Sequence, residues 1–321
     1  MKLERVCVVG AGTIGSLCAV HMAQVANVSL LVRRPEQAKA INDNGLRVTG
    51  KSELVSDVLA TTDPDELPEC DLVIAATKAT QLEAAISPLE GRIAEATFMT
   101  IQNGIGAEKV VSRYGSWPIV SSVTFMSGTR HSDHHIEYEL DTATWMGPYH
   151  ESGISQEVVQ GVGDLFRRAG LKVEVLEDLR PAQWSKLIFN CVVNGVAAVT
   201  DLPHVRLFAQ RESPGDLGHF VRDVMDEGKA VAAARGIELF EDPWEMNVQA
   251  VSHGQTDYDE YAHVPSMLAD IRSGQATEVD FILGSLVSEA GEAGVDVPLS
   301  WGLYRLVKAR EVAAAKQRES A

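Results

Sequence analysis

Along the first half of the chain, short apolar segments alternate with longer segments whose apolar residues recur every three or four positions. Short uninterrupted apolar runs are typical of strands buried on both faces of a parallel sheet, and the second pattern is typical of amphipathic helices. The alternation therefore predicts an α/β domain. The expected strands are Val6–Gly10, Val28–Val32, Asp71–Thr77 and Thr97–Ile101, and the expected helices are Ser16–Ala26, Thr80–Leu89 and Ser155–Ala169.

After Pro118 the apolar runs become shorter and turn residues separate them. We expect short strands there, added antiparallel to the edge of the sheet. A cluster of acidic residues and Pro181 follow, so this domain is expected over residues 1–180. These antiparallel strands are expected over Ile119–Phe125, His135–Leu140 and Thr142–Met146, and a further strand, Lys172–Leu176, is expected after the helix Ser155–Ala169.

Beyond Pro181 the apolar residues repeat at helical spacing, with breaks at proline, glycine and aspartate. Little of this half has strand character, and no internal repeat is visible. The pattern predicts an all-α domain over residues 181–321. Its helices are expected over Trp184–Val199, Leu217–Arg235, Tyr258–Ile271, Ala276–Ala293 and Leu299–Lys316.

The first apolar strand leads directly into Gly10-Ala11-Gly12-Thr13-Ile14-Gly15 and then into a helix. In a Rossmann domain the first glycine of this pattern makes a tight turn, the second lets the backbone approach a pyrophosphate, and the third lets helix pack closely on strand. The N-terminus of the helix then offers oriented N–H groups to the phosphates. We therefore expect a Rossmann-type, dinucleotide-binding domain rather than a glycine-rich turn without a ligand.

The second strand ends in Arg33 and Arg34, at the position where NAD-selective enzymes carry a carboxylate for the ribose hydroxyls. No carboxylate is expected here, and two guanidinium groups suit a 2′-phosphate through charge-assisted hydrogen bonds. The pair favours NADP over NAD; the alternative is two solvated arginines at a strand end. Lys78 and Asn103 follow two later strands, at the sheet edge where ligands bind. We expect Lys78 near a cofactor phosphate and Asn103 near the nicotinamide ribose or the reaction centre.

One stretch of the second half, WSKLIFNCVVN over Trp184–Asn194, places polar residues in an apolar helix. Lys186, Asn190 and Asn194 follow each other at i, i+4 spacing and so share one helix face. A cation and two amides in buried surroundings are costly unless polar partners meet them. Those partners are either other groups of the protein, in a polar seam between helices, or a ligand. The local sequence leaves both interpretations open.

Two further polar residues, Ser266 and Glu278, stand near the expected starts of helices. Ser266 follows a proline and is suited either to cap its helix or to present a hydroxyl to a carboxylate. Glu278 is expected in the first turn of a helix, where a carboxylate interacts favourably with the helix dipole. For each residue, helix capping and ligand binding are alternatives.

The 321 residues include 45 acidic and 28 basic side chains, which gives a net charge of −17. This balance argues against nucleic acid and against an anionic membrane surface as partners, although a local cationic pocket can still hold an anionic ligand. No signal segment precedes the first strand, and no apolar run has the length of a bilayer span. We therefore expect a cytoplasmic protein.

Neither thiol nor metal chemistry is expected. The four cysteines are scattered, without a CxxC pair, and suit reduced, buried thiols; Cys191 is out of phase with Lys186 and Asn190. The cluster His131-Ser132-Asp133-His134-His135 lies in an expected turn. Adjacent histidines in a turn do not easily converge on one ion, and their spacing fits no zinc motif, so we expect an exposed loop and no metal.

Five features together make the chain resemble the ketopantoate reductase family (2-dehydropantoate 2-reductases) over nearly its whole length. They are GAGTIG at 10–15, Lys78 with Gln81, QNGIG at 102–106, WSKLIFNCVVN at 184–194 and PSMLADIRSGQATEVDFILG at 265–284. The last two are far more specific than the glycine pattern. The resemblance implies NADPH-dependent reduction of a 2-oxo acid in the cleft between the two domains. It favours ketopantoate, reduced to D-pantoate in pantothenate biosynthesis.

The resemblance also implies a role for each matched residue. Lys186 corresponds to the catalytic lysine that gives a proton to the ketone oxygen, and Glu278 to a glutamate close to that lysine and the cofactor. An ammonium group there stabilises developing negative charge, burial lowers its pKa, and Glu278 limits that shift. The implied substrate-binding residues are Asn190, Asn194 and Ser266. The implied cofactor-binding residues are Gly10–Gly15, Arg33, Lys78, Gln81, Asn103 and Glu278. We add Arg34 to them because its positive charge suits a 2′-phosphate.

The chain departs from the family pattern at three positions. Gly195 and Ala197 replace a usual proline or alanine and a usual threonine, and His204 stands where well-studied members place another substrate asparagine. We expect His204 to bind substrate, with different hydrogen-bonding demands. The alternative function is thus a D-2-hydroxyacid dehydrogenase of the same family with another substrate. A third hypothesis is a non-catalytic NADP-binding sensor, against which Lys186 argues. The expected partner is a small 2-oxo acid, and a homodimer is left open.

Overall fold

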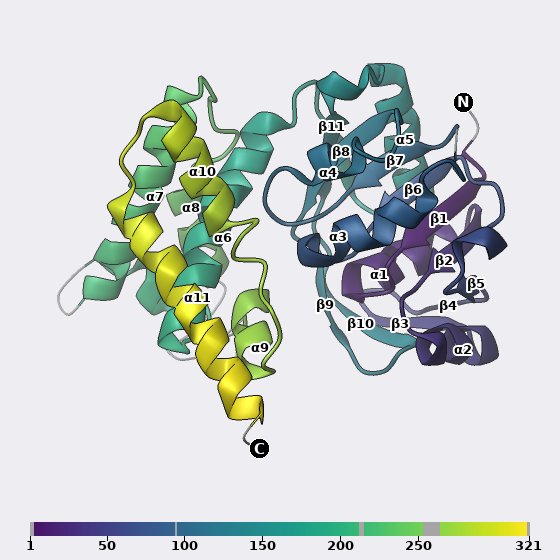
Figure 1. Cartoon of the computed structure of the whole chain (residues 1–321), viewed down its shortest axis with the longest axis horizontal. Helices are drawn as coiled ribbons and strands as arrows, with labels where there is room; N and C mark the ends of the chain where they lie inside the picture. The colour runs from purple at the N-terminus through teal and green to yellow at the C-terminus, as the bar shows by residue number, and fades with distance from the viewer. Residues whose placement is uncertain (1–2, 94, 212–214, 253–263, 320–321) are drawn as a thin grey trace. The chain divides into compact units, whose positions relative to one another are not determined.

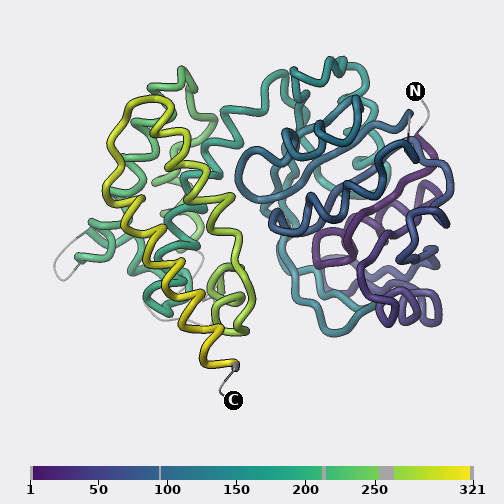
Figure 2. Tube along the Cα trace, viewed as in Figure 1, coloured from purple at the N-terminus to yellow at the C-terminus, as the bar shows by residue number. Residues whose placement is uncertain are grey.

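The computed structural model describes residues 3–93, 95–211, 215–252 and 264–319, and the chain divides into two compact units. Unit 1 comprises Met1–Gln102 and Gly106–Leu179, and unit 2 comprises Asn103–Ile105 and Arg180–Ala321. Every strand in the described part of the chain belongs to unit 1, and the described part of unit 2 is helical (Figures 1 and 2). The predicted fold class, a Rossmann-type α/β domain followed by an all-α domain, is confirmed.

Unit 1 is built on an eight-stranded sheet in the order β12-β11-β8-β7-β6-β1-β2-β5. From β5 to β8 all neighbouring strands are parallel, whereas β11 runs antiparallel to β8. The strand order reverses between β1 and β6, which is the switch point where open α/β sheets bind ligands. The strands are β1 Arg5–Val9, β2 Asn27–Leu31, β5 Leu59–Thr61, β6 Leu72–Ala75, β7 Thr97–Thr100, β8 Ile119–Thr124, β11 Thr144–Pro148 and β12 Val173–Val175.

After Arg5, the central strand β1 is entirely apolar, and both of its faces are covered. Val6 and Val8 pack into one hydrophobic cluster together with Leu17 of α1, while Cys7 and Val9 pack into a second cluster. Because helices cover both faces of the sheet, Val6–Val9 are all buried, and only Arg5 at the start of the strand is exposed. The helices of unit 1 are α1 Thr13–Met22, α2 Pro35–Asn44, α3 Ala79–Ile86, α4 Ala107–Val111 and α5 Gln156–Arg168, with 3₁₀ turns at Pro64–Glu66, Ser87–Leu89 and His150–Ser152.

A second, four-stranded sheet in the order β4-β3-β10-β9 was not predicted. Two expectations for the region after Pro118 are wrong. The strand expected over Ile119–Phe125 is β8, which runs parallel, not antiparallel, to β7. The segment His135–Leu140 does not extend the edge of the main sheet, because it is β10 and pairs with β3 and β9. Its apolar residues Ile136 and Tyr138 are buried in the cluster that also contains Leu17 of α1, which explains the separate sheet. The strands are β3 Leu46–Gly50, β4 Leu54–Ser56, β9 Ser127–Arg130 and β10 His135–Leu140.

Unit 2 is arranged around the long helix α6, which is buried along most of its length and packs against the other helices of the unit (Figure 1). Its close approach to α7 relies on Gly228, where a Cβ atom would lie 2.9 Å from the Ile188 side chain. The helices of unit 2 are α6 Arg180–Thr200, α7 Asp216–Ala234, α8 Pro243–Ser252, α9 Ser266–Arg272, α10 Leu283–Ala293 and α11 Pro298–Glu319, with a 3₁₀ turn at Arg206–Ala209.

Two helix predictions for unit 2 need correction, and one helix of this unit was not predicted. The helix expected from Ala276 begins only at Leu283, since residues 278–282 form an irregular turn. The helix expected over Tyr258–Ile271 is represented by α9, which starts at Ser266, and residues 258–263 of that prediction lie outside the described part of the chain. Helix α8 was not predicted, because its ten residues follow the Asp242–Pro243 break with little helical periodicity.

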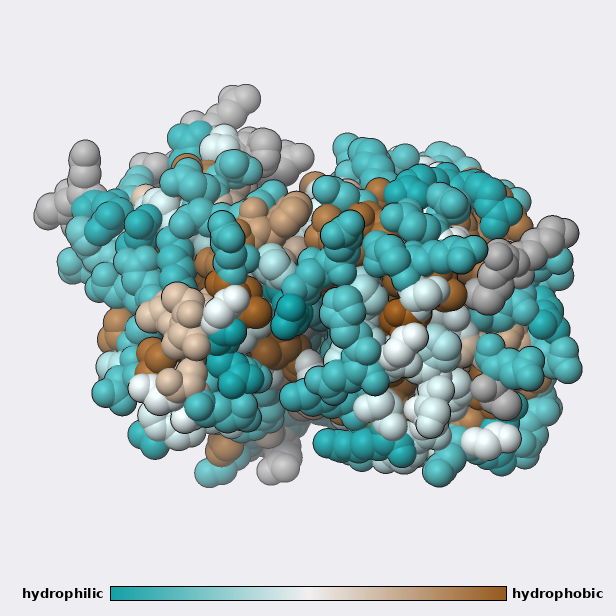
Figure 3. Space-filling view, turned by 90° about the horizontal axis from the view of Figure 1, so that it is seen from above, coloured by the Kyte–Doolittle hydropathy of each residue, from teal (hydrophilic) through white to brown (hydrophobic). Residues whose placement is uncertain are grey.

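On the face drawn in Figure 3, hydrophilic residues predominate and apolar residues lie in small groups. Large apolar side chains that stay exposed include Trp301, Leu306 and Val312 of α11. Among the described helices, none combines the length and the apolar character that crossing a membrane requires.

Candidate active site

In the glycine segment after β1, two glycines are required by the surrounding backbone and one is not. Gly10 has a φ of +99°, and a Cβ atom there would lie 2.8 Å from Thr77 Cγ2. At Gly15 a Cβ atom would lie 1.9 Å from the Gly10 carbonyl oxygen, so both glycines are required by the backbone itself. Gly12 is different: its φ is −78°, and no atom lies within 4 Å of the position of a Cβ. The open space above Gly12, at the N-terminus of α1, fits a dinucleotide pyrophosphate.

The loop after β6 lies beside the glycine segment and is held by a side chain that follows the next strand of the sheet, β7. Gln102 donates hydrogen bonds to the carbonyl oxygens of Ala75 (2.7 Å) and Thr77 (3.1 Å). Lys78 follows as the first residue before α3, and both Lys78 and Gln81 are exposed to solvent. The structure thus places a cation at the carboxyl end of β6, next to the strand-order switch, as the sequence predicted.

Arg33 and Arg34 lie at the carboxyl end of β2, but only Arg33 is well exposed. Arg34 forms an ion pair with Asp133, from the loop between β9 and β10. We expected no carboxylate beside these arginines. None is present in the sequence next to β2, but the fold brings the Asp133 carboxylate to Arg34, so the expectation is wrong. Asp133 stands in the histidine cluster, and nothing in the local sequence indicates its proximity to Arg34.

The histidine cluster itself forms the end of the β9–β10 hairpin. His131 pairs with Glu137 at 2.8 Å, and His135 lies 3.0 Å from the Thr49 hydroxyl. Burial, together with the nearby Arg47 charge, lowers the pKa of His135. Among the described residues, no three His, Cys, Asp or Glu side chains are placed to hold one metal ion.

Asn103 groups with unit 2, although the strand before it belongs to unit 1. The three-residue segment is fixed by Gly104, whose φ is +90° and where a Cβ atom would lie 2.0 Å from the Phe281 carbonyl oxygen. The Asn103 side-chain oxygen accepts a hydrogen bond from the Asn190 amide at 3.4 Å. Two residues expected at the site from distant motifs, Asn103 and Asn190, are thus brought into contact.

The polar stripe on α6 is buried, as its sequence indicated. Lys186 is 5% exposed, and Asn190 and Asn194 are 6% exposed each. Burial lowers the pKa of Lys186 to about 8, and the carboxylate of Glu278 acts in the opposite direction. A lysine with this pKa is still largely an ammonium at neutral pH, yet it loses its proton far more easily than a surface lysine.

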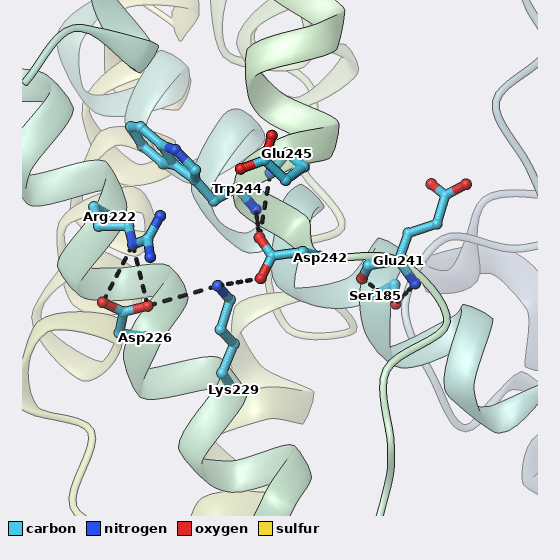
Figure 4. A network of polar contacts seen from close by, with 8 residues as sticks. All are labelled: Ser185, Arg222, Asp226, Lys229, Glu241, Asp242, Trp244 and Glu245. Atoms are coloured by element: carbon cyan, nitrogen blue, oxygen red, sulfur yellow. Dashed lines mark hydrogen bonds and ion pairs between the residues drawn. The ribbon is translucent and has the colours of Figure 1, made fainter.

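The start of α6 is anchored close to Lys186 by Ser185. This side chain is fully buried, its hydroxyl lies 2.8 Å from the Glu241 carbonyl oxygen, and it accepts a hydrogen bond from the Glu241 N–H at 3.0 Å (Figure 4). The same close-up shows Lys229 of α7 between Asp226 and Asp242, in a network separate from the α6 stripe. Helix α6 is therefore held in place by a hydroxyl adjacent to the buried cation.

Asn194 connects α6 to α9. Its side-chain oxygen accepts hydrogen bonds from the Ser266 hydroxyl and the Met267 N–H, both at 3.3 Å. At the other end of α9, Arg272 donates to the Asp201 carboxylate at 2.9 Å. Ser266 remains exposed, so its hydroxyl is both held by Asn194 and accessible.

Glu278 is 8% exposed and lies in the turn before α10, not in the first turn of a helix as expected. The residues beside it are fixed on α11. Thr277 donates from its N–H and its hydroxyl to Glu311, at 2.8 and 2.7 Å, and Asp280 accepts from Tyr304 at 2.7 Å. These contacts hold a buried carboxylate within electrostatic range of Lys186.

His204 is buried in an aromatic setting. Its Nε2 lies 2.8 Å from the Asn247 side-chain oxygen, and the Asn247 amide donates to the Phe208 carbonyl oxygen at 3.1 Å. Because that carbonyl determines which way Asn247 points, His204 carries its proton on Nε2. The rings of Phe189 and Phe208 pack edge-on against the imidazole. Asn247 was missed by the sequence analysis, since it lies on the unpredicted helix α8.

Two sequence features near the stripe have packing explanations. A Cβ atom on Gly195 would lie 2.8 Å from Leu283 and 2.9 Å from Leu303, so this position serves close helix packing. Cys191 is fully buried, and burial raises the pKa of its thiol, so it has no nucleophilic character.

Comparison with known proteins agrees with this geometry. The family model described as ketopantoate reductase PanE/ApbA matches residues 6–151, and its C-terminal counterpart matches residues 178–311. A 2-dehydropantoate 2-reductase of Pyrococcus horikoshii is 31% identical over 308 residues, which cover 96% of this chain and 97% of that protein. This chain belongs to the ketopantoate reductase family. It is therefore an oxidoreductase that acts on CH–OH groups and depends on a dinucleotide.

Solved structures show the same architecture. A PanE/ApbA family ketopantoate reductase from Ralstonia eutropha JMP134 superimposes with a TM-score of 0.83 at 25% identity, covering 97% of this chain and 99% of that one. A D-mandelate dehydrogenase, crystallised with NADH and anilino(oxo)acetate, also has a TM-score of 0.83 at 21% identity, with the same coverage. The second likeness concerns the fold alone. It shows that proteins of different name share this fold.

Proposed function

We propose that this protein reduces a 2-oxo acid with NADPH, and that its substrate is ketopantoate, converted to D-pantoate for pantothenate biosynthesis. The observation that carries the proposal is Lys186, a cation that is 5% exposed and whose pKa is lowered to about 8. It shares a helix face with two amides and interacts with a buried carboxylate. The matching relatives bear the name 2-dehydropantoate 2-reductase, which supports ketopantoate as the substrate.

In the proposed mechanism Lys186 is the general acid. Negative charge develops on the carbonyl oxygen during reduction, and the ammonium group stabilises that charge and then gives up a proton to it. Glu278 keeps Lys186 protonated to a higher pH than burial alone would allow. When bound, the dinucleotide supplies the hydride.

The substrate residues are proposed to be the polar groups near the stripe. Asn190 and Asn194 present neutral amides, which orient the carboxylate and the hydroxyl of the acid without competing with Lys186 for its proton. Ser266 adds an accessible hydroxyl at the start of α9. His204 is proposed to select among acids, because an imidazole pinned by Asn247 cannot make the hydrogen bonds of an asparagine.

The cofactor residues are proposed on the strand-order switch of unit 1. The glycine segment Gly10–Gly15 receives the pyrophosphate, Lys78 and Gln81 lie at the adjacent loop, and Arg33 and Arg34 receive the 2′-phosphate of NADPH. The domain over residues 1–180 then holds the dinucleotide, and the domain over residues 181–321 provides the substrate residues. Asn103, in contact with Asn190, and Glu278 are proposed where the two ligands react.

The test is oxidation of NADPH in the presence of ketopantoate, compared with a panel of branched 2-oxo acids that lack its hydroxyl group. We expect kcat/KM to be highest for ketopantoate. Faster turnover of another acid would replace ketopantoate by the alternative, a D-2-hydroxyacid dehydrogenase of other specificity, which His204 favours. Binding of dinucleotide without turnover of any acid would overturn the enzymatic proposal and favour a sensor.

A further inference from the structure

Three segments of unit 1 that are far apart in sequence meet beside the glycine segment. Gln37 of α2 is buried, and its amide donates to the Ala11 carbonyl oxygen at 2.8 Å and lies 3.5 Å from the Asp133 carbonyl oxygen. Strand β9 also lies next to the glycine segment, since a Cβ atom on Gly128 would lie 3.2 Å from Thr13 Cγ2. The β9–β10 hairpin therefore flanks the side of the dinucleotide site on which β2 ends.

At this point one carboxylate pairs with one guanidinium group and lies close to a second. The Asp133 oxygen Oδ1 pairs with Arg34 and lies 3.9 Å from an Arg130 nitrogen. The three side chains are only partly exposed, at 39% for Arg34, 28% for Asp133 and 45% for Arg130. Two guanidinium groups around one anionic oxygen form the arrangement that also binds a phosphate.

A carboxylate and a pair of arginines favour different groups at the 2′ position of the adenosine ribose. A carboxylate accepts hydrogen bonds from a free 2′-hydroxyl, as in NAD-binding sites, whereas guanidinium groups favour a 2′-phosphate. In most such sites the carboxylate would stand at the end of β2, where this chain has arginines. Here it comes instead from the β9–β10 hairpin and already neutralises part of the charge of Arg34 and Arg130.

We propose that Asp133 determines cofactor preference. It competes with the 2′-phosphate of NADPH for Arg34 and Arg130, accepts the 2′-hydroxyl of NADH, and so keeps the enzyme able to use both cofactors. Arg130 is accordingly a further phosphate-binding residue. The inference rests on the proposed dinucleotide site of unit 1. It adds to that site a residue that determines cofactor preference and that lies in the β9–β10 hairpin, not at the end of β2.

The experiment measures dissociation constants of NADPH and NADH by their fluorescence, without 2-oxo acid, in wild-type protein and in single variants. In Asp133→Asn we expect tighter NADPH and weaker NADH binding, so that the preference for NADPH rises about tenfold, as expected for removal of one nearby negative charge. In Arg130→Gln the preference falls. Asp164→Asn is the matched control, because Asp164 also pairs with an arginine but lies on α5, at the other end of the sheet.

Competition by adenosine 2′,5′-bisphosphate and by 5′-AMP gives a second measure, since these probes differ only at the ribose 2′ position. A preference unchanged within about twofold in Asp133→Asn, or both dinucleotides weakened equally, would overturn the inference while leaving the proposed function intact. An Arg130→Gln variant with unchanged preference would remove Arg130 from the phosphate site and overturn its part of the inference. Wild-type protein that binds neither dinucleotide would overturn both the inference and the proposed function.

Discussion

The two candidate sites of this molecule are built in opposite ways. The residues proposed to bind the dinucleotide in unit 1 come from short consecutive segments and use backbone geometry, and Gly12, Arg33, Lys78 and Gln81 among them are exposed. The polar residues of unit 2 are mostly buried side chains, and they are linked across long sequence separations, as buried Asn194 is to the exposed Ser266. A site of the first kind binds through local geometry, and a site of the second kind depends on tertiary packing. The difference predicts how each site responds to substitution.

The largest effect is expected at Lys186. Lys186→Ala removes the proposed proton donor, and we expect kcat to fall about 10²- to 10⁴-fold while the dissociation constant of NADPH stays within a factor of about two. Steady-state kinetics and fluorescence titration measure the two quantities. Lys229→Ala is the matched control, because Lys229 is a lysine of the same unit that pairs with Asp226 and Asp242 instead (Figure 4). An unchanged kcat in Lys186→Ala contradicts the mechanism.

In unit 1, substitutions in the glycine segment test cofactor binding instead of catalysis. In Gly12→Ala the added methyl meets no protein atom, so we expect the melting temperature to stay unchanged while the NADPH dissociation constant rises about thirtyfold, because the methyl occupies the pyrophosphate space. In Gly15→Ala the methyl meets the Gly10 carbonyl oxygen at 1.9 Å, and we expect a fall of more than about 5 °C. Gly161→Ala, on α5 with nothing within 4 Å, is the control. Unaltered NADPH binding in Gly12→Ala would place the cofactor elsewhere.

His204 tests whether substrate choice resides in unit 2. His204→Asn restores the amide usual in the family, and we expect the ratio of kcat/KM for ketopantoate to that for an acid without a hydroxyl to rise about tenfold. Asn247→Ala removes the partner of the imidazole without altering the imidazole itself, so it separates a steric effect from a hydrogen-bonding one. If both variants lower kcat/KM equally for every acid, His204 has only a packing role.

The smallest effect is a change of pH profile. If the Lys186 ammonium donates the proton, kcat/KM falls as the pH rises through about 8, because the required protonated form is lost there. Glu278 raises the pKa of Lys186, so in Glu278→Gln that decline starts at lower pH. Profiles of kcat/KM from pH 6 to 10 measure both curves. A Glu278→Gln profile that declines at the wild-type pH or higher excludes this role for Glu278.

The fold could be predicted from sequence wherever burial imposes a simple pattern. Val6–Val9 of β1 are all apolar because helices cover both faces of the sheet, and α6 shows its polar stripe at regular spacing. The second sheet was missed because its strands are short and bury only one face against α1. The start of α10 was misplaced because the turn at 278–282 resembles helix in its apolar spacing.

For the candidate sites, the sequence named residues but not their partners. Lys186 and Asn190 are visible from spacing alone, whereas the contact between Asn190 and Asn103 depends on how a loop folds back. Likewise Asp133 and Arg34 are 99 positions apart, so their pairing follows from the second sheet, which was not predicted. Motifs thus identify which chemical groups are present, and tertiary structure decides which groups meet.

The assignment of Asn103–Ile105 to unit 2 has a consequence for how such proteins can be rearranged. The chain passes from one unit to the other three times, at Gln102, at Ile105 and at Leu179. A genetic exchange at Leu179 would therefore combine a foreign Asn103 segment with the native α6 and replace the partner of Asn190. The two halves are not interchangeable modules, and a chimera would need to inherit its QNGIG loop from the same parent as its helical half.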